Sequence, residues 1–267
     1  MSDLADDLVA DLVSVAEAAA DAARVQTLRH FRSATLSADS KHAVFDPVTV
    51  ADRAAEQAMR AVIAKRRPDD AILGEEFAAS SGTTGLTWVL DPIDGTRGYL
   101  SGTPTWGVLV AVSDASGPLF GLIDQPYIGE RFAGGFGRAS YAGPRGRTAL
   151  RTRPARPLGE AILFTTFPEV GTESERRAFR RVADRARLTR YGMDCYAYAL
   201  VAAGQIDLVI EAGLHPYDIH APIAVIEAAG GIVTGWTGGP AHGGGQVIAA
   251  ANAAIHAEAL ALLGAAS

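Results

Sequence analysis

The chain has 267 residues, of which 48% are hydrophobic and 20% are charged, and its formal net charge is −6. This composition excludes an intrinsically disordered protein, which would contain fewer apolar residues. The length suffices for one large domain or two smaller ones around a buried core. The acidic balance argues against a sequence-independent nucleic-acid binder, which would carry a basic face. The single cysteine, Cys195, excludes an intrachain disulfide and any zinc site built from several cysteines.

The N-terminal segment and the hydropathy pattern bear on location. The first residues carry acids where a secretory signal peptide needs positive charge. The sequence contains no run of about eighteen uncharged apolar residues, so we expect no membrane span. A single cysteine fits a reducing compartment. These features predict a cytoplasmic protein.

The first half of the chain predicts helices followed by strands. Apolar residues recur at helical spacing from Leu4 to Ala19, with acids at the start, where the helix dipole favours them. A second helix is expected from Thr49 to just before Pro68, with Asp52 placed to complete a cap resembling a capping box. Four short apolar runs rich in branched residues then predict strands: AILG, TWVLD, WGVLVAV and PLFGLID.

The second half predicts alternating strands and helices. Residues 134–157 are rich in glycine, arginine and proline, and we expect the seam between two subdomains, 1–150 and 151–267, in this stretch. The expected strands are AILFTT, RLTRYG, IDLVIEAG, GIVTGW and QVIAAA. The expected helices are Glu173–Ala186, Asp194–Ala203, Asp218–Ala229 and Ala254–Leu263. Such alternation predicts α/β layers in which helices cover mixed sheets.

The segment WVLDPIDGT is the most informative stretch. Pro92 cannot continue a strand ladder, so the strand is expected to end there, with Asp91 and Asp94 around one tight turn. Two carboxylates held so close repel, and one takes up a proton unless a cation lies between them. Hard oxygen ligands select Mg²⁺ over zinc. Alternatively, both acids only cap the turn, where aspartate is common. If a helix starts at Gly95-Thr96, its free backbone N–H groups would suit a phosphate.

Four further acids lie where strands end or helices begin. Glu75 and Glu76 follow a short apolar strand, at the end where α/β sheets usually build their sites. Asp218 lies at the mouth of an apolar helix, and Asp52 lies near the start of another. For both aspartates, helix capping is the simpler explanation. The residues alone therefore leave their role open.

Four motifs, in this order, resemble those of the inositol monophosphatase superfamily of Mg²⁺-dependent phosphatases: DPVTVAD, GEE, WVLDPIDGT and PYDIHAPIAVIEAAGG. The resemblance extends from about Val9 to Leu263. It implies a layered αβαβα fold, usually a homodimer, and two or three Mg²⁺ ions that activate water against a phosphate monoester. It also implies the metal ligands: Glu75, Asp91, Asp94, Asp218 and the backbone carbonyl of Ile93.

The same resemblance implies roles for the residues around the metals. Asp52 resembles the acid that acts through Thr96 on a nucleophilic water, and Glu75 joins them as a catalytic residue. Gly95 and Thr96 resemble the phosphate cradle. Lys41 falls on a loop that lies over the site in the family.

Two departures from the family pattern are visible. Tyr217 replaces a tryptophan that many members have before the last ligand. Arg97-Gly98-Tyr99 replaces a Thr-Asn-Phe or similar sequence. Neither removes a ligand, but both would reshape the substrate side of the pocket.

Asp194 and Glu211 lie where the family places groups that touch the leaving alcohol. Many inositol phosphatases have a small residue in place of Asp194. Two carboxylates suit a cationic group better than a neutral polyol, because opposite charges attract in a partly desolvated pocket. Histidinol phosphate carries an ammonium group and an imidazole. RGYLSG, PTWGVLVAV and GLIDQPYIGERFAGG also resemble the histidinol-phosphatase branch. We therefore predict a histidinol-phosphate phosphatase of histidine biosynthesis, with no nucleic-acid or membrane partner.

Three alternatives remain. Inositol-1-phosphate or another small polyol phosphate is the main alternative substrate. A 3′-phosphonucleotide phosphatase is less favoured, because such members usually carry long insertions and this chain is compact. A non-catalytic metal-binding relative is disfavoured, because every expected ligand and the Asp52–Thr96 pair are present.

Overall fold

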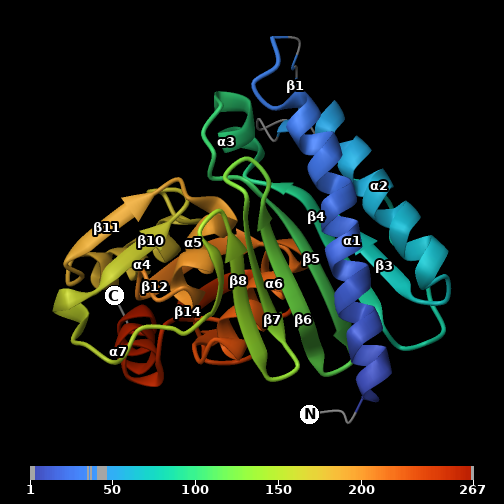
Figure 1. Ribbon diagram of the computed structural model, residues 1–267. Helices are drawn as coiled ribbons and strands as arrows, with labels where there is room; N and C mark the ends of the chain where they lie inside the picture. Colours follow the sequence, from blue (N-terminus) through green and yellow to red (C-terminus); the bar gives the residue numbers. More distant parts are fainter. Residues whose placement is uncertain (1–3, 35, 37, 41–46, 266–267) are drawn as a thin grey trace.

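Figure 1 shows a computed structural model in which two β-sheets and the helices around them are stacked in layers. The structure describes residues 4–34, 36, 38–40 and 47–265. Lys41, whose place over the site is implied by the family resemblance, lies outside the described residues. Within them, no helix is both long and apolar enough to cross a membrane.

The first sheet takes its strands from the N-terminal part of the chain. Its order is β3 (Ala71–Gly74), β4 (Thr87–Asp94), β5 (Gly107–Asp114), β6 (Gly117–Gln125), β7 (Glu130–Gly135), β8 (Arg138–Gly143) and β9 (Gly146–Ala149). Only β3 and β4 run parallel; each later strand pairs antiparallel with the one before. A separate two-stranded ribbon joins β1 (Ala38–Ser40) to β2 (Pro47–Thr49).

The second sheet mixes parallel and antiparallel strands from the C-terminal part. Its order is β11 (Leu188–Tyr191), β10 (Ile162–Thr165), β12 (Leu208–Leu214), β14 (Gly245–Ala250) and β13 (Ile232–Thr234). The strand β10 runs parallel to both β11 and β12, as expected where helices connect successive strands. The carboxyl ends of β10 and β12 therefore lie at the same edge of the sheet.

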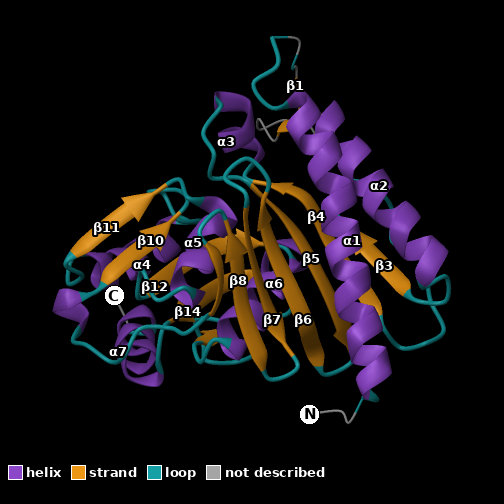
Figure 2. Ribbon diagram, in the orientation of Figure 1, coloured by secondary structure: helices purple, strands orange, loops and turns teal. Residues whose placement is uncertain are grey.

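Helices cover both sheets (Figure 2). They are α1 (Asp6–His30), α2 (Val50–Arg66), α3 (Thr96–Ser101), α4 (Glu173–Ala183), α5 (Asp194–Ala202), α6 (Pro216–Ala228) and α7 (Ala253–Leu263), with a short 3₁₀ turn at Leu158–Glu160. Three apolar clusters show the layering: α1 and α2 pack on one face of the first sheet, α5 and α6 pack between the sheets, and α4 and α7 cover the outer face of the second. The predicted αβαβα architecture is confirmed.

The helix α6 is buried along most of its surface. Ile219, Ile223 and Val225 are among its buried residues, and the helix touches the first sheet as well as β13. A helix that is apolar all round is expected in such a central layer. Because α6 belongs to the C-terminal part of the chain yet packs on the N-terminal sheet, the boundary between residues 150 and 151 stays a prediction.

One detail of the predicted strands was wrong. The strand β4 does not end at Pro92 but continues to Asp94, because its pairing with β5 shifts register between Asp91 and Asp94 and needs no ladder bond from the proline. The glycine-rich stretch after residue 134 forms β-strands up to Ala149. A Cβ on Gly134 would lie 2.5 Å from Val225 Cα, so glycine serves close packing of α6 there and does not mark a loop.

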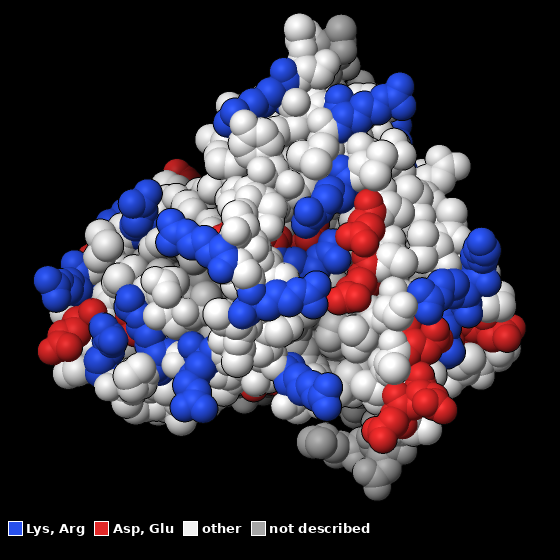
Figure 3. Space-filling model, in the orientation of Figure 1, with Lys and Arg blue, Asp and Glu red and all other residues white. Residues whose placement is uncertain are grey.

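Surface charge is unevenly distributed. On the face drawn in Figure 3, basic side chains predominate over β10, β11 and the segment that precedes them, whereas acids gather along α1. The acidic balance of the whole chain therefore does not describe this face.

Candidate active site

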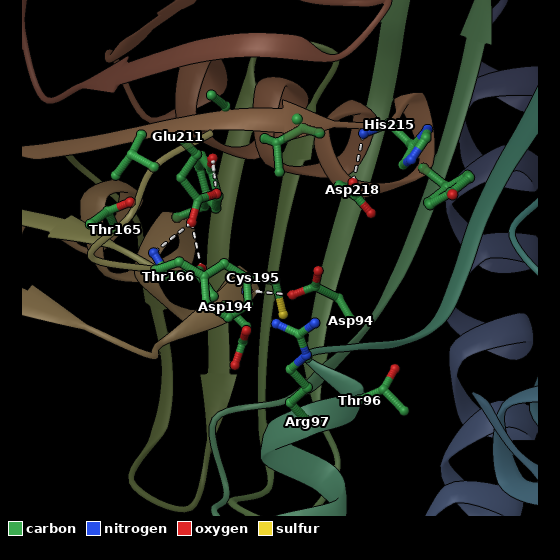
Figure 4. A pocket seen from close by; sticks show the side chains of 18 of the residues that line it. Asp94, Thr96, Arg97, Thr165, Thr166, Asp194, Cys195, Glu211, His215 and Asp218 are labelled. Carbon is green, nitrogen blue, oxygen red and sulfur yellow. Dashed lines mark hydrogen bonds between the residues drawn. The ribbon is translucent and has the colours of Figure 1, made fainter. Parts of the chain in front are cut away.

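A pocket of about 400 Å³ lies where the N-terminal and C-terminal parts of the chain meet. It is lined from one side by the ends of β3 and β4 and the start of α3, and from the other by the ends of β10 and β12 and the starts of α5 and α6. Figure 4 shows that the carboxylates of Asp94, Asp194, Glu211 and Asp218 lie around this pocket and come from both parts of the chain. Of the residues predicted for the site and described, Glu75, Asp94, Gly95, Thr96, Asp194, Glu211 and Asp218 line this pocket.

Three predicted metal ligands come together. Carboxylate oxygens of Asp91, Asp94 and Asp218 all lie within 4.8 Å of one another. Burial raises the pKa of Asp91 and of Asp94, and nearby carboxylates, including Asp218, raise both further. Burial also raises the pKa of Asp218 to about 7. Crowded oxygen donors that repel one another fit a divalent cation, and their hardness favours Mg²⁺.

The turn after β4 is held by its own hydrogen bonds. The backbone N–H of Ile93 donates to Asp91 Oδ1 at 3.0 Å. The backbone N–H of Cys195 donates to Asp94 Oδ2 at 2.5 Å and so ties α5 to the end of β4. These bonds orient the carboxylates before any ligand arrives. The Cys195 thiol is buried, and burial raises its pKa, which disfavours a role as nucleophile.

Asp52 caps α2 and also faces Thr96. The Thr49 backbone N–H and hydroxyl both donate to Asp52 Oδ2, at 2.8 and 2.6 Å, so the capping prediction is confirmed. The Thr96 hydroxyl lies 3.1 Å from the Ile93 carbonyl oxygen and 3.4 Å from Asp52 Oδ1. Burial raises the Asp52 pKa to about 6, in the range useful for proton transfer near neutral pH.

The turn that carries Glu75 is held by a buried acid for which the sequence predicted no role. Glu56 lies one helical turn after Asp52 on α2 and is fully buried. Its Oε2 accepts the backbone N–H of Glu76 at 2.6 Å, and its Oε1 pairs with Arg60 Nε at 2.7 Å. Arg60 also donates to the Phe77 carbonyl at 3.1 Å. Both backbone groups belong to the residues just after Glu75, so this pair holds the Glu75 turn in place.

Asp218 makes a capping hydrogen bond and also belongs to the carboxylate cluster. The helix α6 begins at Pro216, so Asp218 is its third residue and does not occupy the cap position. Its Oδ2 accepts the backbone N–H of His215 at 2.7 Å, which satisfies a free donor at the helix start. Capping thus orients this carboxylate toward Asp91 and Asp94.

Asp194 adopts an unusual backbone conformation. Its φ is +46°, in the left-handed region that costs free energy for a non-glycine residue and that often marks functional sites. Gly95 (φ +86°) faces it, and a Cβ there would lie 2.7 Å from Asp194 Cγ. Asp194 Oδ2 accepts one long hydrogen bond, 3.5 Å, from Thr105. Burial and then Glu211 raise the Asp194 pKa to about 6, whereas Arg97 acts in the opposite direction.

Glu211 is held by three donors. The Thr166 backbone N–H (2.9 Å) and hydroxyl donate to Oε1, and the Tyr198 hydroxyl donates to Oε2 at 2.7 Å. Burial raises the Glu211 pKa, while these hydrogen bonds oppose the rise. Thr166 and Tyr198 were not predicted. Thr166 follows β10 at a strand's carboxyl end, which is the one signal that pointed to it.

Comparisons with known proteins agree with this arrangement. A model of the inositol monophosphatase family matches residues 9–266. The bifunctional phosphatase IMPL2 of Arabidopsis thaliana chloroplasts is 41% identical over 89% of this chain and 68% of its own. A histidinol-phosphatase of Mycobacterium tuberculosis is 34% identical over 96% of this chain and 98% of its own. A solved inositol monophosphatase of Zymomonas mobilis superposes with a TM-score of 0.84 at 37% identity, covering 95% and 97% of the two chains. The chain therefore belongs to the inositol monophosphatase family and is a metal-dependent phosphomonoesterase.

Proposed function

We propose that the protein hydrolyses histidinol phosphate. The observation that carries this proposal is a further pair of carboxylates, the half-buried Asp194 and the buried Glu211, in the pocket that also holds the metal-ligand cluster. Two acids whose pKa values are raised by burial have free energy to gain from a cation. An ammonium group bound there would offset their repulsion, whereas a neutral polyol would leave it in place. The similarity to a histidinol-phosphatase over nearly the whole chain supports the same choice.

In the proposed mechanism, Glu75, Asp91, Asp94, Asp218 and the Ile93 carbonyl hold two or three Mg²⁺ ions. When bound, Mg²⁺ neutralises phosphate charge, lowers the pKa of water and stabilises the leaving oxygen. The chain orients the reactants. Gly95 and Thr96 present backbone N–H groups to the phosphoryl oxygens at the start of α3.

The chain's own proton path runs through Thr96. The Thr96 hydroxyl oxygen takes a proton from the attacking water and passes its own proton to Asp52 Oδ1, which lies 3.4 Å away. The raised pKa of Asp52 makes its carboxylate a stronger proton acceptor than an exposed aspartate. Asp194 and Glu211 hold the ammonium group of the alcohol, so that the ester oxygen faces the metal end.

Inositol-1-phosphate is the competing substrate, because the Zymomonas mobilis structure is that of an inositol monophosphatase and is 37% identical to this chain. A homodimer is also proposed, and light scattering during gel filtration would measure it. The cytoplasmic location stays a prediction.

The substitution Asp194→Asn tests the proposal. Asparagine tolerates the left-handed backbone and keeps the shape of the side chain but removes its charge. We expect kcat/KM for histidinol phosphate to fall by roughly 10- to 100-fold, the range of a lost buried ion pair. The value for inositol-1-phosphate should be unchanged or higher. Asp184→Asn, at an exposed residue after α4, is the matched control. An equal loss on both substrates would contradict the proposal.

A further inference from the structure

Phe167 is an apolar side chain left exposed inside the pocket lining. It follows β10, next to the Thr166 that holds Glu211, and 46% of its surface is accessible. Apolar rings in a pocket wall are typical contact surfaces for the organic part of a ligand. Neither the metal cluster nor the proton path uses this ring.

The ring of Phe167 already carries a planar cation. The guanidinium carbon of Arg97 lies 4.8 Å from the centre of the ring, a cation–π distance. Arg97 belongs to α3 and comes directly after Gly95 and Thr96, whereas Phe167 comes from the other part of the chain. Figure 4 shows Arg97 rising from α3 into the space between Asp94 and Asp194. Its charge lowers the pKa of Asp194.

The position of the Arg97 side chain therefore indicates which chemical groups this part of the pocket can bind. A flat, positively charged group rests on an aromatic face and lies close enough to the half-buried carboxylate of Asp194 to stabilise its ionised form. A substrate with a planar heteroaromatic ring and an ammonium group offers the same two features. Its phosphate dianion would at the same time attract the displaced guanidinium, since Arg97 adjoins the predicted phosphate cradle.

We propose that Phe167 is the ring platform of this phosphatase, meaning the aromatic surface on which a planar ring of the substrate stacks. In the free protein the guanidinium of Arg97 lies on the platform; in the complex the planar ring of the substrate's alcohol replaces it, and Arg97 turns to the phosphate. The substrate class is then a phosphate monoester of an amino alcohol that carries a flat heteroaromatic ring. This inference rests on the proposed function and adds the residue that distinguishes a ring-bearing ammonium ester from a ring-free one.

The test compares three esters: histidinol phosphate, which has an ammonium group and a ring; 2-aminoethyl phosphate, which has the ammonium group alone; and inositol-1-phosphate, which has neither. Phe167→Leu keeps apolar volume and removes the aromatic face, and Phe167→Tyr restores it. We expect Phe167→Leu to raise KM for histidinol phosphate by roughly 3- to 10-fold, the usual worth of an aromatic stack. The KM values of the other two esters should change less than about twofold. Phe167→Tyr should behave as wild type.

Tyr127→Leu is the matched control. Tyr127 is 48% exposed and lies under Arg32, whose guanidinium carbon is 4.6 Å from its ring centre, but it does not line the pocket. This variant should leave the ratios of the KM values for the three esters unchanged. If Phe167→Leu raises KM equally for all three esters, or does not raise it at all, the proposed role of Phe167 is contradicted.

Failure of the platform and failure of the proposed function give different results. If wild type favours histidinol phosphate but Phe167→Leu raises KM equally for all esters, the proposed function is supported and the role of Phe167 is contradicted. If wild type hydrolyses inositol-1-phosphate as well as histidinol phosphate, while Phe167→Leu weakens only the latter, the platform stands and the proposed function falls.

Discussion

The two ends of the pocket are built on different principles. At the metal end, backbone hydrogen bonds fix Asp91, Asp94 and Asp218 against their mutual repulsion. At the organic end, Glu211 is likewise held by three donors, but Asp194 has one long hydrogen bond and Phe167 keeps an exposed face. The carboxylates of the metal cluster are thus held in advance of the reaction, whereas Asp194 and Phe167 retain binding capacity for a ligand.

The two ends meet at the start of α5. The carboxylate of Asp194 lies against Gly95, in the predicted phosphate cradle, and the next residue of the chain, Cys195, holds Asp94. Orientation of the substrate's cation and of the phosphate therefore depends on the same start of α5. We therefore expect substitutions at the metal end to slow the hydrolysis of every substrate. Substitutions at the organic end should slow the hydrolysis of one class of substrate.

The largest effect is expected from removing a metal ligand. Asp94→Asn takes one negative charge from the cluster of three carboxylates. We expect phosphate release to fall by at least about 1,000-fold on all substrates, because the charge that holds the cation is lost. Calorimetric titration with Mg²⁺ should show the loss of binding directly. A variant that still binds Mg²⁺ like wild type and turns over would remove Asp94 from the metal site.

The next effect is expected from the proton path. Asp52→Asn keeps an oxygen that can cap α2 but removes the proton acceptor opposite Thr96. We expect kcat to fall by about 100- to 10,000-fold with Mg²⁺ affinity nearly unchanged. Rate measurements at saturating substrate, combined with the same calorimetric titration, separate this outcome from a lost metal site. If Mg²⁺ affinity falls with kcat, Asp52 serves the metals and not the water.

A smaller effect is expected from the anchor of the Glu75 turn. Glu56→Gln keeps an acceptor for the Glu76 backbone N–H but breaks the charge pair with Arg60. We expect Mg²⁺ affinity to fall by roughly tenfold, as for other groups that orient a metal ligand. Excess Mg²⁺ should then restore most of the activity. The same loss of activity at any Mg²⁺ concentration would show that Glu56 acts on folding or on chemistry instead.

The smallest effect concerns stability without metal. The pKa of Asp218 is about 7 in the folded chain against an ordinary value of 3.8, because burial disfavours its charged form. The folded state therefore binds a proton that the unfolded chain releases. This contribution to stability is complete below about pH 4 and is lost as the pH rises through about 7. In EDTA, Tm should fall by about 4 °C or more between pH 5 and pH 8.

Mg²⁺ replaces the proton in this account, so saturating Mg²⁺ should flatten the Tm profile over the same pH range. Asp218→Asn, which has no proton to release, should show a weaker dependence in EDTA. Differential scanning calorimetry measures both. A metal-free Tm that rises between pH 5 and pH 8 would contradict the raised pKa.

The metal end was only partly readable in the sequence. Asp91 and Asp94 lie in one short segment, where residue type and spacing pointed either to a cation or to a turn cap. Asp52 and Asp218 lie near helix starts, where the residues alone left their role open and the family resemblance implied it. Even there, the sequence did not show how β4 continues through Pro92, since that depends on how β5 pairs with it.

The organic end was less readable because it depends on tertiary contacts. Glu211 and Asp194 were found by their place in the family pattern. No role was predicted for Thr166, Tyr198 or Phe167, and the packing of β10 beside β12 and α5 brings them to the pocket. The role of Gly134 in β7 was not predicted either, because it lies in the close approach of α6.

The most direct test of the account is the substrate preference of the unmodified protein. The ratio of kcat/KM for histidinol phosphate to that for inositol-1-phosphate would be measured at saturating Mg²⁺ with both esters in the same buffer. The acid pair at the organic end predicts a ratio above about 10, equivalent to one favourable ion pair in a partly desolvated pocket. A ratio near or below one would contradict the assignment of Asp194 and Glu211 to a cationic alcohol.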